Sequence, residues 1–450
     1  RNKQNFESMI TSNIKAEIGK IISPSIVLRI AYPFLIGFKV LTYGLTSLHF
    51  KTNVIKELNL LRRNDFDHLS YEECIKLFDK INSKLLKKWY ITIENDFFVM
   101  TYLGVLKKML SDAEIQRVLT FASKATEQVD ALALLSQQIS RIDDLWSAVQ
   151  NGDVETFDNK ILNYRNIASE IEVYMHTYGG RFANELKLES KGIDEDRSKL
   201  LSVLKLYHTY KARVLADKQY KDTSSSLGFK EWFILNKFKK YASQREEFRL
   251  LRSNTFAMAR KLFRRIGNIF VTENILNFTD DIFYLTLEEI LNKNKFVSEY
   301  RSLVNQRKDK YKSYNDITPP SHFSTSNRQA PRVALPDLQT GGNISGQPAS
   351  SGKITGRIRV FREFFIPSQI DFDILVTSHT DPGWTPLIAL SKGLIIEHGG
   401  ILSHASIVAR ELGIPTVIGV ENATTFLKDG DIVELDGANG IIKVQKHENR

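Results

Sequence analysis

The sequence predicts a protein of two parts, a large all-helical region followed by a small α/β domain. Residues 1–314 contain little Pro or Gly and carry apolar residues at three-to-four spacing between charges, as in Tyr71–Tyr90 and Ala113–Gln150. Residues 315–352 are rich in Pro, Ser, Gly and Asn, which is typical of a flexible linker. After this linker, residues 353–450 alternate short apolar runs with turn residues, and this pattern predicts an α/β domain.

The most apolar stretch of the helical region is residues 26–50. Arg29, Pro33 and Lys39 interrupt it, so its longest uncharged run is too short to span a bilayer. We expect a buried helical hairpin here. An apolar substrate pocket and contact with a membrane surface are the two alternatives.

Local signals divide the rest of the helical region. Asn151-Gly152-Asp153 breaks the helical periodicity and predicts a loop. Thr286, with Glu289 three residues later, predicts a capping box at a helix start. The region has neither the strand–helix alternation of a TIM barrel nor a glycine-rich phosphate loop, so it does not predict a nucleotide site.

Three arginines mark one candidate phosphate-binding surface. Arg245, Arg249 and Arg252 lie at i, i+4 and i+7, so one helix face presents three guanidinium groups. Guanidinium forks suit phosphate oxygens. The alternative is a solvated face on which Glu246 and Glu247 are the partners of the arginines.

A second candidate site is Tyr178–Leu188, with the sequence YGGRFANELKL. Arg181 and Glu185 are two of its three charged residues, and a family resemblance given below implies that they bind substrate or phosphate. The alternative is an ordinary i, i+4 ion pair on a helix, which contributes a few tenths of a kcal/mol.

The α/β domain is built of short elements. Strands are expected at Lys353–Val360, Asp373–Thr377, Leu394–Ile396, Thr416–Val420, Asp431–Leu435 and Ile441–Val444, and helices at Thr385–Ser391 and His404–Leu412.

The start of the second of these helices carries the chemistry. Ser403 is a good N-cap, which places His404 at the first helical position and off the apolar face. A helix start carries unpaired N–H groups and a partial positive charge, so it attracts anions and disfavours imidazolium. A histidine that accepts a phosphoryl group benefits from both effects. The alternative is a histidine that only helps to cap the helix, or one that is buried and bonded.

The composition narrows the function further. The net charge of +10 is spread along the chain without basic runs interleaved with aromatics, so we expect no nucleic-acid partner. A single cysteine favours a reducing compartment, and we expect a cytoplasmic protein. His379 and His398 lie near His404 in sequence, but their spacings match no zinc site, so we expect no bound metal. The chain starts at Arg1 without a visible signal peptide, as a processed product or a piece of a longer chain would.

The run Gly399–Gly419, GGILSHASIVARELGIPTVIG, closely resembles the phosphohistidine mobile domain of the PEP-utilising enzymes. These include pyruvate phosphate dikinase, phosphoenolpyruvate synthase and rifampicin phosphotransferase, and Enzyme I of the sugar phosphotransferase system shares the core pattern. The resemblance implies that His404 is the phosphoryl-accepting histidine, with Ser403 beside it. It also implies that Thr380, in a T-D-P element, orients the imidazole or its phosphoryl group.

The helical region resembles the same proteins in three further places. Tyr178–Leu188 is similar to an aromatic-Gly-His-Arg signature, although Gly180 stands in place of the histidine and the following Asp-Pro is absent. Arg245–Gly267 resembles their arginine-rich helix, and Thr279–Glu289 resembles a D-D-I-F-Y-L-T run that we interpret as structural. A helical region before the mobile domain, with no barrel after it, resembles rifampicin-phosphotransferase-like proteins.

The resemblance implies a phosphotransferase that uses ATP and Mg²⁺. The ATP-grasp domain that binds both in these proteins has no counterpart in this sequence, so we expect a separate domain or subunit as partner. In this scheme His404 swings on the linker and passes its phosphoryl group to a small-molecule acceptor held by the helical region. Such a relay needs room for phosphate beside the ring. Phosphoryl-activated ligation and a non-catalytic phosphohistidine carrier that relays phosphate to a protein are the alternatives. We expect no membrane association.

Overall fold

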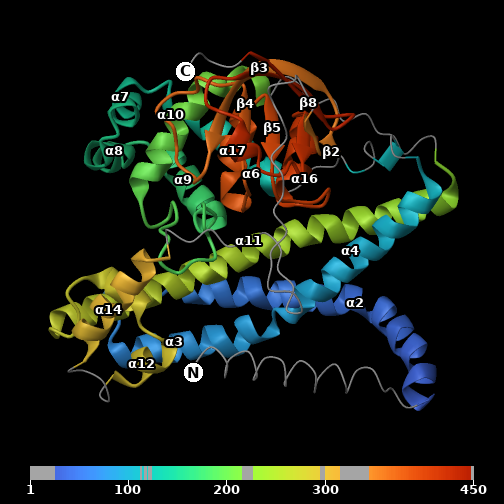
Figure 1. Ribbon diagram of the computed structural model, residues 1–450. Coiled ribbons are helices and arrows are strands. Elements are labelled where there is room, and N and C mark those ends of the chain that lie inside the picture. The colour runs from blue at the N-terminus through green and yellow to red at the C-terminus, as the bar shows by residue number, and fades with distance from the viewer. Residues whose placement is uncertain are drawn as a thin grey trace. The chain divides into compact units, whose positions relative to one another are not determined.

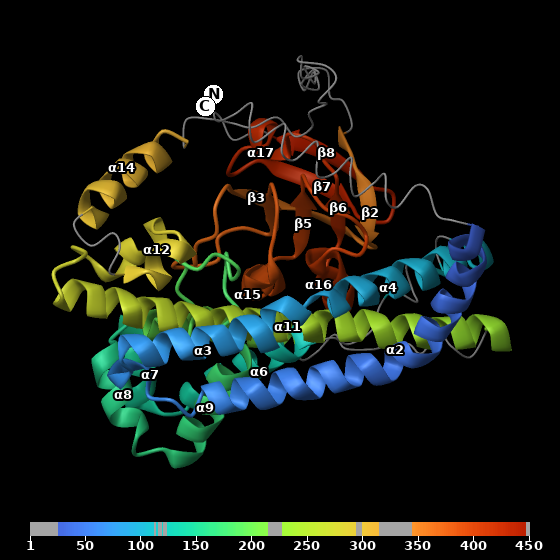
Figure 2. The same ribbon diagram turned by 90° about the horizontal axis from the view of Figure 1, so that it is seen from below.

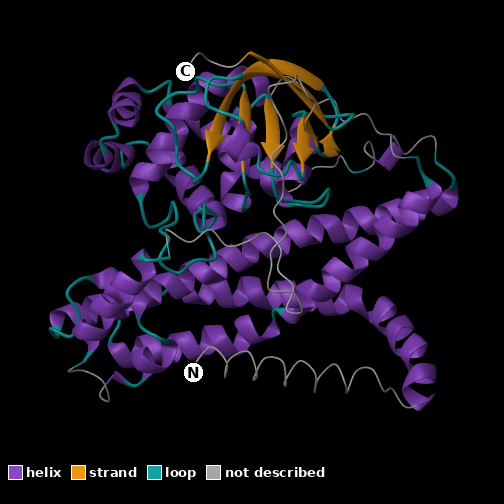
Figure 3. Cartoon of the chain, viewed as in Figure 1, coloured by secondary structure: helices purple, strands orange, loops and turns teal. Residues whose placement is uncertain are grey.

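The computed structural model describes residues 26–111, 114–115, 119, 124–214, 227–293, 299–314 and 344–446. The chain divides into two compact units, Arg1–Glu57 and Leu58–Arg450. The division therefore does not fall at the predicted linker, because the C-terminal sheet and most of the helices belong to one unit. Helices come first along the chain and the sheet comes last, which confirms the predicted fold class (Figure 3).

Residues 26–50 do not form the predicted hairpin. They belong to one continuous helix, α2, which runs from Ile26 to Leu61. The prediction relied on Pro33, but a proline inside a helix removes a backbone hydrogen bond and bends the axis without reversing the chain. The side chains of residues 26–41 lie outside the described part, so the alternatives for this stretch stay open. None of the described helices has the length and apolar character needed to cross a bilayer.

The helical part of the second unit is built of short helices around one very long one. The helices are α3 (Tyr71–Lys84), α4 (Tyr90–Met109), α6 (Lys124–Ile139), α7 (Asp143–Asn151), α8 (Val154–Ile161), α9 (Arg165–Tyr178), α10 (Arg197–Val214), α11 (Phe229–Thr272), α12 (Leu287–Leu291) and α14 (Tyr300–Lys312), with short 3-10 turns at Phe66–His68, Leu86–Lys88 and Thr279–Tyr284.

Local chemistry sets several of these boundaries as predicted. Gly152 ends α7 in the left-handed region at φ 66°, and Asp153 caps α8 by accepting from the Thr156 N–H. Thr286 and Glu289 form both bonds of a capping box at the start of α12.

Helix α11 is the axis of this unit, and α3, α4, α6 and the Thr279–Tyr284 turn pack along it (Figure 1). The α4–α11 contact is fixed by Asn95, which donates to the Tyr241 carbonyl at 2.9 Å, and by the stacked rings of Phe98 and Tyr241. Because α11 is buried along much of its length, several polar side chains on it are removed from water, including Glu246 and Arg260.

The C-terminal domain is a mixed sheet in the order β1-β8-β7-β3-β4-β5-β6-β2. Strands β3 to β6 are parallel neighbours and the other pairs are antiparallel. The strands are β1 (Ile344–Ser345), β2 (Gln347–Ser350), β3 (Lys353–Phe361), β4 (Ile374–Thr377), β5 (Gly393–Ile396), β6 (Thr416–Ile418), β7 (Ile432–Asp436) and β8 (Ile441–Lys446). All six predicted strands are present, within a residue or two of their predicted ends.

The predicted linker is too long at its C-terminal end. Residues 344–350 form both edges of the sheet, β1 against β8 and β2 against β6. Their Gly, Pro and Ser content predicts a loop. An edge strand, however, is hydrogen-bonded on one side only and can therefore contain Pro348. Residues 315–343, the rest of the predicted linker, lie outside the described part of the chain.

Two short helices lie between the sheet and the helical region (Figure 2). Helix α15 (Thr385–Leu390) packs on α6 and α10, and helix α16 (His404–Leu412) packs on α6. The predicted apolar face of α16 is buried in the domain core through Ala405, Val408 and Ala409. The other face of this helix layer is therefore turned toward the helical region.

The closest approach between the two parts joins two segments that the sequence analysis selected. The Asp381 carboxylate accepts a hydrogen bond from the Asn184 N–H at 2.6 Å. A Cβ on Gly383 would overlap the peptide between Phe182 and Ala183. The T-D-P-G-W element therefore docks, backbone against backbone, on the segment that follows Arg181.

We expect Gly383→Ala to loosen this contact. The added methyl group would overlap the peptide between Phe182 and Ala183, so that peptide would have to move. Opening should expose the buried His404. Its modification by diethyl pyrocarbonate, followed by mass spectrometry, should speed up about tenfold or more, which corresponds to about 1.4 kcal/mol of docking free energy.

Gly400→Ala is the matched control, because a Cβ at Gly400 meets no atom within 4 Å. Equal modification rates in the two variants would mean that the Gly383 contact does not hold the domain in place.

Candidate functional site

His404 begins α16 in a loop that is held from inside its own domain. Ser403 caps the helix by accepting from the Ser406 N–H at 3.3 Å, as predicted, and Gly413 ends it at φ 68°. The buried Arg410 guanidinium donates to the Ile401 and Ala349 carbonyls and ties the loop to strand β2. Ser403 thus positions the helix start, and its hydroxyl bonds Ser406 rather than the ring.

Both ring nitrogens of His404 are hydrogen-bonded. Nδ1 lies 2.7 Å from Oε2 of Glu246 on α11, and Nε2 lies 2.7 Å from Oγ1 of Thr385 on α15. A carboxylate only accepts, so Nδ1 carries the proton that it donates to Glu246. In the neutral ring Nε2 then holds the lone pair, which makes it the nucleophilic nitrogen.

The hydroxyl of Thr385 has two acceptors within reach, His404 Nε2 and the Pro382 carbonyl, each at 2.7 Å. The Pro382 carbonyl is already satisfied by the Thr385 N–H. Thr385 can therefore donate to Nε2, or turn its proton to Pro382 and release the lone pair. The resemblance predicts that Thr380 orients the imidazole or its phosphoryl group. In the structure the hydroxyl bonded to the ring is that of Thr385, five residues later on α15, and a contact of Thr380 with a phosphoryl group stays a prediction.

The ring is closed in. His404 is only 5% exposed, although the sequence analysis expected a position off the buried face with room for phosphate. The helix does turn this residue away from its own domain core, but it packs the ring against α11 instead. Burial lowers the pKa of His404, with the Arg181 and Arg249 charges acting in the same direction and Glu246 acting against it. A ring that is neutral at pH 7 follows.

Glu246 is fully buried and stays ionised. Burial alone would raise the pKa of its carboxyl group, but His404, Arg249 and Arg181 outweigh it and hold the pKa below its ordinary value. Arg249 donates to Oε1 at 2.8 Å, and Arg181 lies 3.9 Å from Oε2. The sequence analysis considered Glu246 only as a partner of the arginines, and it did not identify this residue as the partner of His404.

Arg181 is the most unusual group of the site. It is 1% exposed, and none of its three guanidinium nitrogens donates a hydrogen bond to the protein. Buried arginines are normally bonded, because an unpaired buried charge is costly. Among the described residues, the one ionic neighbour of Arg181 within 4 Å is Glu246, which already bonds His404 and Arg249. The unused donors beside the imidazole are suited to an anion.

Glu185 lies in the same segment but does not pair with Arg181. Residues 181–190 form turns rather than a helix, so the i, i+4 geometry of the alternative interpretation is absent. Glu185 is 2% exposed, and neither carboxyl oxygen accepts a hydrogen bond. Burial raises its pKa to about 7, opposed by the Arg181 charge.

The three arginines of the predicted α11 face take different roles. Arg245 donates to the Leu402 carbonyl at 2.7 Å and lies 2.7 Å from Asp96, so it fastens the histidine loop to the helical region. Arg249 holds Glu246. Arg252 lies near Glu185, and its buried Nε has no partner.

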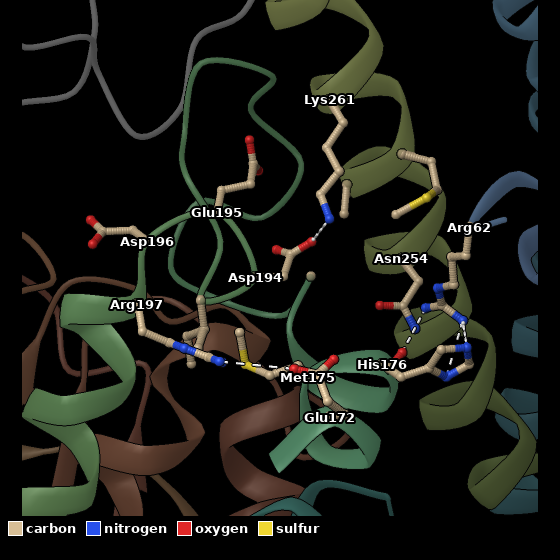
Figure 4. Close-up of a pocket in the computed structure, with 14 residues that line it drawn as sticks. Arg62, Glu172, Met175, His176, Asp194, Glu195, Asp196, Arg197, Asn254 and Lys261 are labelled. Carbon is tan, nitrogen blue, oxygen red and sulfur yellow. Dashed lines mark hydrogen bonds and ion pairs between the residues drawn. The ribbon is translucent and has the colours of Figure 1, made fainter. Parts of the chain in front are cut away.

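Two cavities flank the segment that carries Arg181. One, of about 500 Å³, is bordered by Gly180 and by polar side chains of α9, α11 and the 193–197 loop (Figure 4). The other, of about 420 Å³, is bordered by Phe182 and Asn184 and, from the C-terminal domain, by Phe364. Gly180 itself packs tightly, because a Cβ there would lie 2.9 Å from Ala257 and Asn254. The histidine of the resembled signature would not fit this backbone position without a shift of α11.

Most charges in the larger cavity are already paired. Lys261 lies 2.9 Å from Asp194, Arg197 lies 3.8 Å from Glu172, and Arg62 bonds His176 (Figure 4). Within the described residues, no three His, Cys, Asp or Glu side chains gather as metal ligands would. The arginines around His404 are instead suited to phosphoryl oxygens.

Comparison with known proteins agrees with this chemistry. Residues 370–440 match the family model of the PEP-utilising enzyme, mobile domain. The model covers the turn with Asp381, helix α15 with Thr385, and His404 at the start of α16.

The curated relatives of this chain include three rifampicin phosphotransferases. The one from Bacillus cereus is 40% identical over 177 residues, which are 39% of this chain and 20% of the relative. Those from Bacillus subtilis and Streptomyces sviceus are 37% and 36% identical over 39% and 38% of the chain and 20% of each relative. The chain therefore matches about a fifth of the length of these relatives, and it is similar to phosphotransferases.

Because Glu185 is protonated more readily in the folded protein than in the unfolded chain, its stabilising contribution is complete below pH 4.5. It is lost as the pH rises through about 7. Glu185→Gln, which stays neutral, should raise the thermal unfolding midpoint relative to wild type at pH 8 and have less effect at pH 5. Differential scanning calorimetry at the two pH values measures this.

Glu170→Gln makes the same change at an exposed position on α9 and should give the same midpoint as wild type at both pH values. A Glu185→Gln effect that does not depend on pH would contradict the raised pKa.

Proposed function

We propose that this chain is the phosphoryl-carrying and acceptor-binding part of an ATP-dependent phosphotransferase. His404 Nε2 accepts a phosphoryl group as the P–O bond of the donor breaks. It then delivers the group to a small molecule at the helical region. The observation that carries the proposal is the buried, unbonded Arg181 beside a histidine whose nucleophilic nitrogen is fixed by Glu246.

The roles of the residues follow from their charges. Phosphorylation of Nε2 leaves positive charge on the ring, and Glu246 at Nδ1 stabilises it. Arg181 would neutralise the phosphoryl oxygens, and Arg249 keeps Glu246 ionised in place. Phosphoryl transfer depends mostly on such positioning and charge neutralisation.

The donor reaches His404 at another place. Where the domain rests on α11 the ring is enclosed and Nε2 is bonded to Thr385, which leaves no room for a phosphoryl group. We infer that the domain leaves this position to be loaded, and that the contact around the ring opens to admit the phosphorylated ring when the domain returns to deliver. Residues 315–343 are the proposed tether. We assign ATP and Mg²⁺ to an ATP-grasp domain or subunit outside this chain, as in the resembled proteins. ATP supplies the phosphoryl group, and Mg²⁺ neutralises its charge when bound there.

The enclosed site favours an enzyme over a carrier that serves a protein partner, because a relay to another protein needs an exposed face around the histidine. The two cavities lie at Gly180 and at Phe182–Asn184, on either side of Arg181 in the chain, and we propose that one of them admits the acceptor to the delivery position. Three relatives are named for phosphoryl transfer to rifampicin, and a polar organic molecule with a hydroxyl group is the acceptor class we propose here. Ligation through the same phosphoryl intermediate is the second candidate.

Treatment with [³²P]phosphoramidate, a small phosphoryl donor for histidine, tests the carrier role without the missing partner. Among the nine histidines of the chain, His404 should give an acid-labile, base-stable label that His404→Ala removes. Peptide mapping locates the label. Label confined to the other histidines would reject the assignment.

Arg181→Met should abolish delivery of the label without lowering the unfolding midpoint. The variant removes a buried charge that donates no hydrogen bond, and its ionic neighbour Glu246, 3.9 Å away, keeps its bonds to His404 and Arg249. Arg260→Met is the matched comparison on α11. That arginine is equally buried, but it donates to Glu195 at 2.9 Å and to the Glu185 carbonyl at 2.7 Å. Its loss should cost about 3 kcal/mol or more. Equal destabilisation by both variants would show that Arg181 is a structural residue.

A further inference from the structure

Glu185 is a buried carboxyl group that no structural role accounts for. It is 2% exposed, both of its oxygens lack hydrogen bonds, and it forms no ion pair within 4 Å in the described part of the chain. Ser253 lies beside it but directs its hydroxyl proton to the Arg249 carbonyl at 2.9 Å. A buried carboxyl group without partners costs stability, so it needs another explanation.

The surroundings of Glu185 are those of the delivery site. The charges that act on it are Arg181 and Arg252 of the helical region and Asp381 of the C-terminal domain. Arg181 also faces the Glu246–His404 pair. The Arg181 charge therefore acts on both Glu185 and the imidazole. The two residues are also joined through the backbone, because Asn184, next to Glu185, bonds Asp381 in the turn that leads to Thr385, the partner of His404.

The other two carboxylates of the site are already hydrogen-bonded, although burial raises the pKa of Asp381 above its ordinary value. Glu246 accepts from His404 Nδ1 and from Arg249, and these contacts hold its pKa below the ordinary value. Asp381 accepts from the Asn184 N–H and the Gly383 N–H. Glu185 alone among the three has both oxygens unused.

We propose that Glu185 is the proton acceptor for the hydroxyl group that attacks the phosphoryl group on His404. This assignment rests on the proposed function. As the new O–P bond forms, the hydroxyl proton passes to Glu185, and the P–Nε2 bond breaks. Its electron pair returns to Nε2, which restores a neutral ring whose Nδ1–H still donates to Glu246. Glu185 then loses its proton to solvent when the domain departs.

The raised pKa of Glu185, about 7, fits this task, because a base works best when its pKa lies near the working pH. Arg181 and Arg252 compensate charge on either side of the reaction: before transfer they face the carboxylate, and after transfer they face the phosphorylated product. The acceptor class that follows is an alcohol or a phenol, since the base needs a proton to remove.

The test compares wild type, Glu185→Gln and the control Glu170→Gln, each loaded at His404 with [³²P]phosphoramidate. Label leaving His404 is followed in the presence of rifampicin and in buffer alone, where water is the hydroxyl acceptor. Glu185→Gln should load normally but release label to either acceptor about 100-fold more slowly or worse. The wild-type rate should rise with pH to a plateau with a midpoint near 7, and the Glu185→Gln rate should be independent of pH.

The outcomes separate the two proposals. If His404 does not load in any variant, the proposed function fails and the role of Glu185 fails with it. If it loads but Glu185→Gln releases label at the wild-type rate with the wild-type pH profile, only the role of Glu185 is overturned. It is also overturned if folded wild type releases label no faster than the urea-unfolded protein. Glu185→Asp, which keeps the carboxyl group, should recover part of the rate and excludes a purely structural effect.

Discussion

The hydrogen bond between Glu246 and His404 joins two parts of the chain that lie 158 residues apart, and the chemistry of the site depends on it. It fixes the proton on Nδ1 and so selects Nε2 as the nucleophile. It also gives the buried carboxylate and the buried ring a hydrogen-bond partner each, so neither group is left unsatisfied when α16 packs on α11. Because the bond crosses between the domain and the helical region, it exists only when the two are in contact. The histidine is therefore in its most defined state at the position where we propose that it delivers.

The site contains buried charged groups that are hydrogen-bonded to each other and buried charged groups that form no hydrogen bond. Arg249, Glu246 and His404 form a satisfied chain, whereas Arg181 and Glu185 are buried without bonds. Unsatisfied buried groups are rare because folding gains nothing from them. Here a cation and a carboxyl group without hydrogen bonds come from the same segment of the chain, and the cation lies beside the Glu246–His404 pair. A substrate that brings phosphoryl oxygens and a hydroxyl proton would satisfy both at once.

The sequence was sufficient for features set by local chemistry. Ser403 and Gly413 as helix boundaries, the apolar face of α16 and the capping box at Thr286 all follow from neighbouring residues, and the structure confirms them. Selection of His404 came from a long motif. Its partners could not be found in this way, because Glu246 looks like any acid between two arginines on a helix, and Thr385 like a residue that starts one.

The predictions that the structure contradicts also failed because local sequence does not report contacts between distant residues. An edge strand such as β2 has no pattern of its own, because its partner β6 supplies the hydrogen bonds. Arg181 and Glu185 sit at helical spacing, but the docked T-D-P-G-W element and α11 hold them in a turn. The burial of His404 depends on where an entire domain rests. Each of these features is decided by contacts between residues far apart in the chain, which periodicity does not report.

Two arginines donate hydrogen bonds to successive carbonyls of the loop that precedes His404. Arg410 of the same domain holds Ile401, and Arg245 of α11 holds Leu402. If the C-terminal domain separates from α11, only the Arg245–Leu402 hydrogen bond of these two is broken. The loop that carries His404 would thus keep its conformation while the domain moves. Rebinding to α11 would then require the Arg245–Leu402 hydrogen bond to form again, without refolding of the loop.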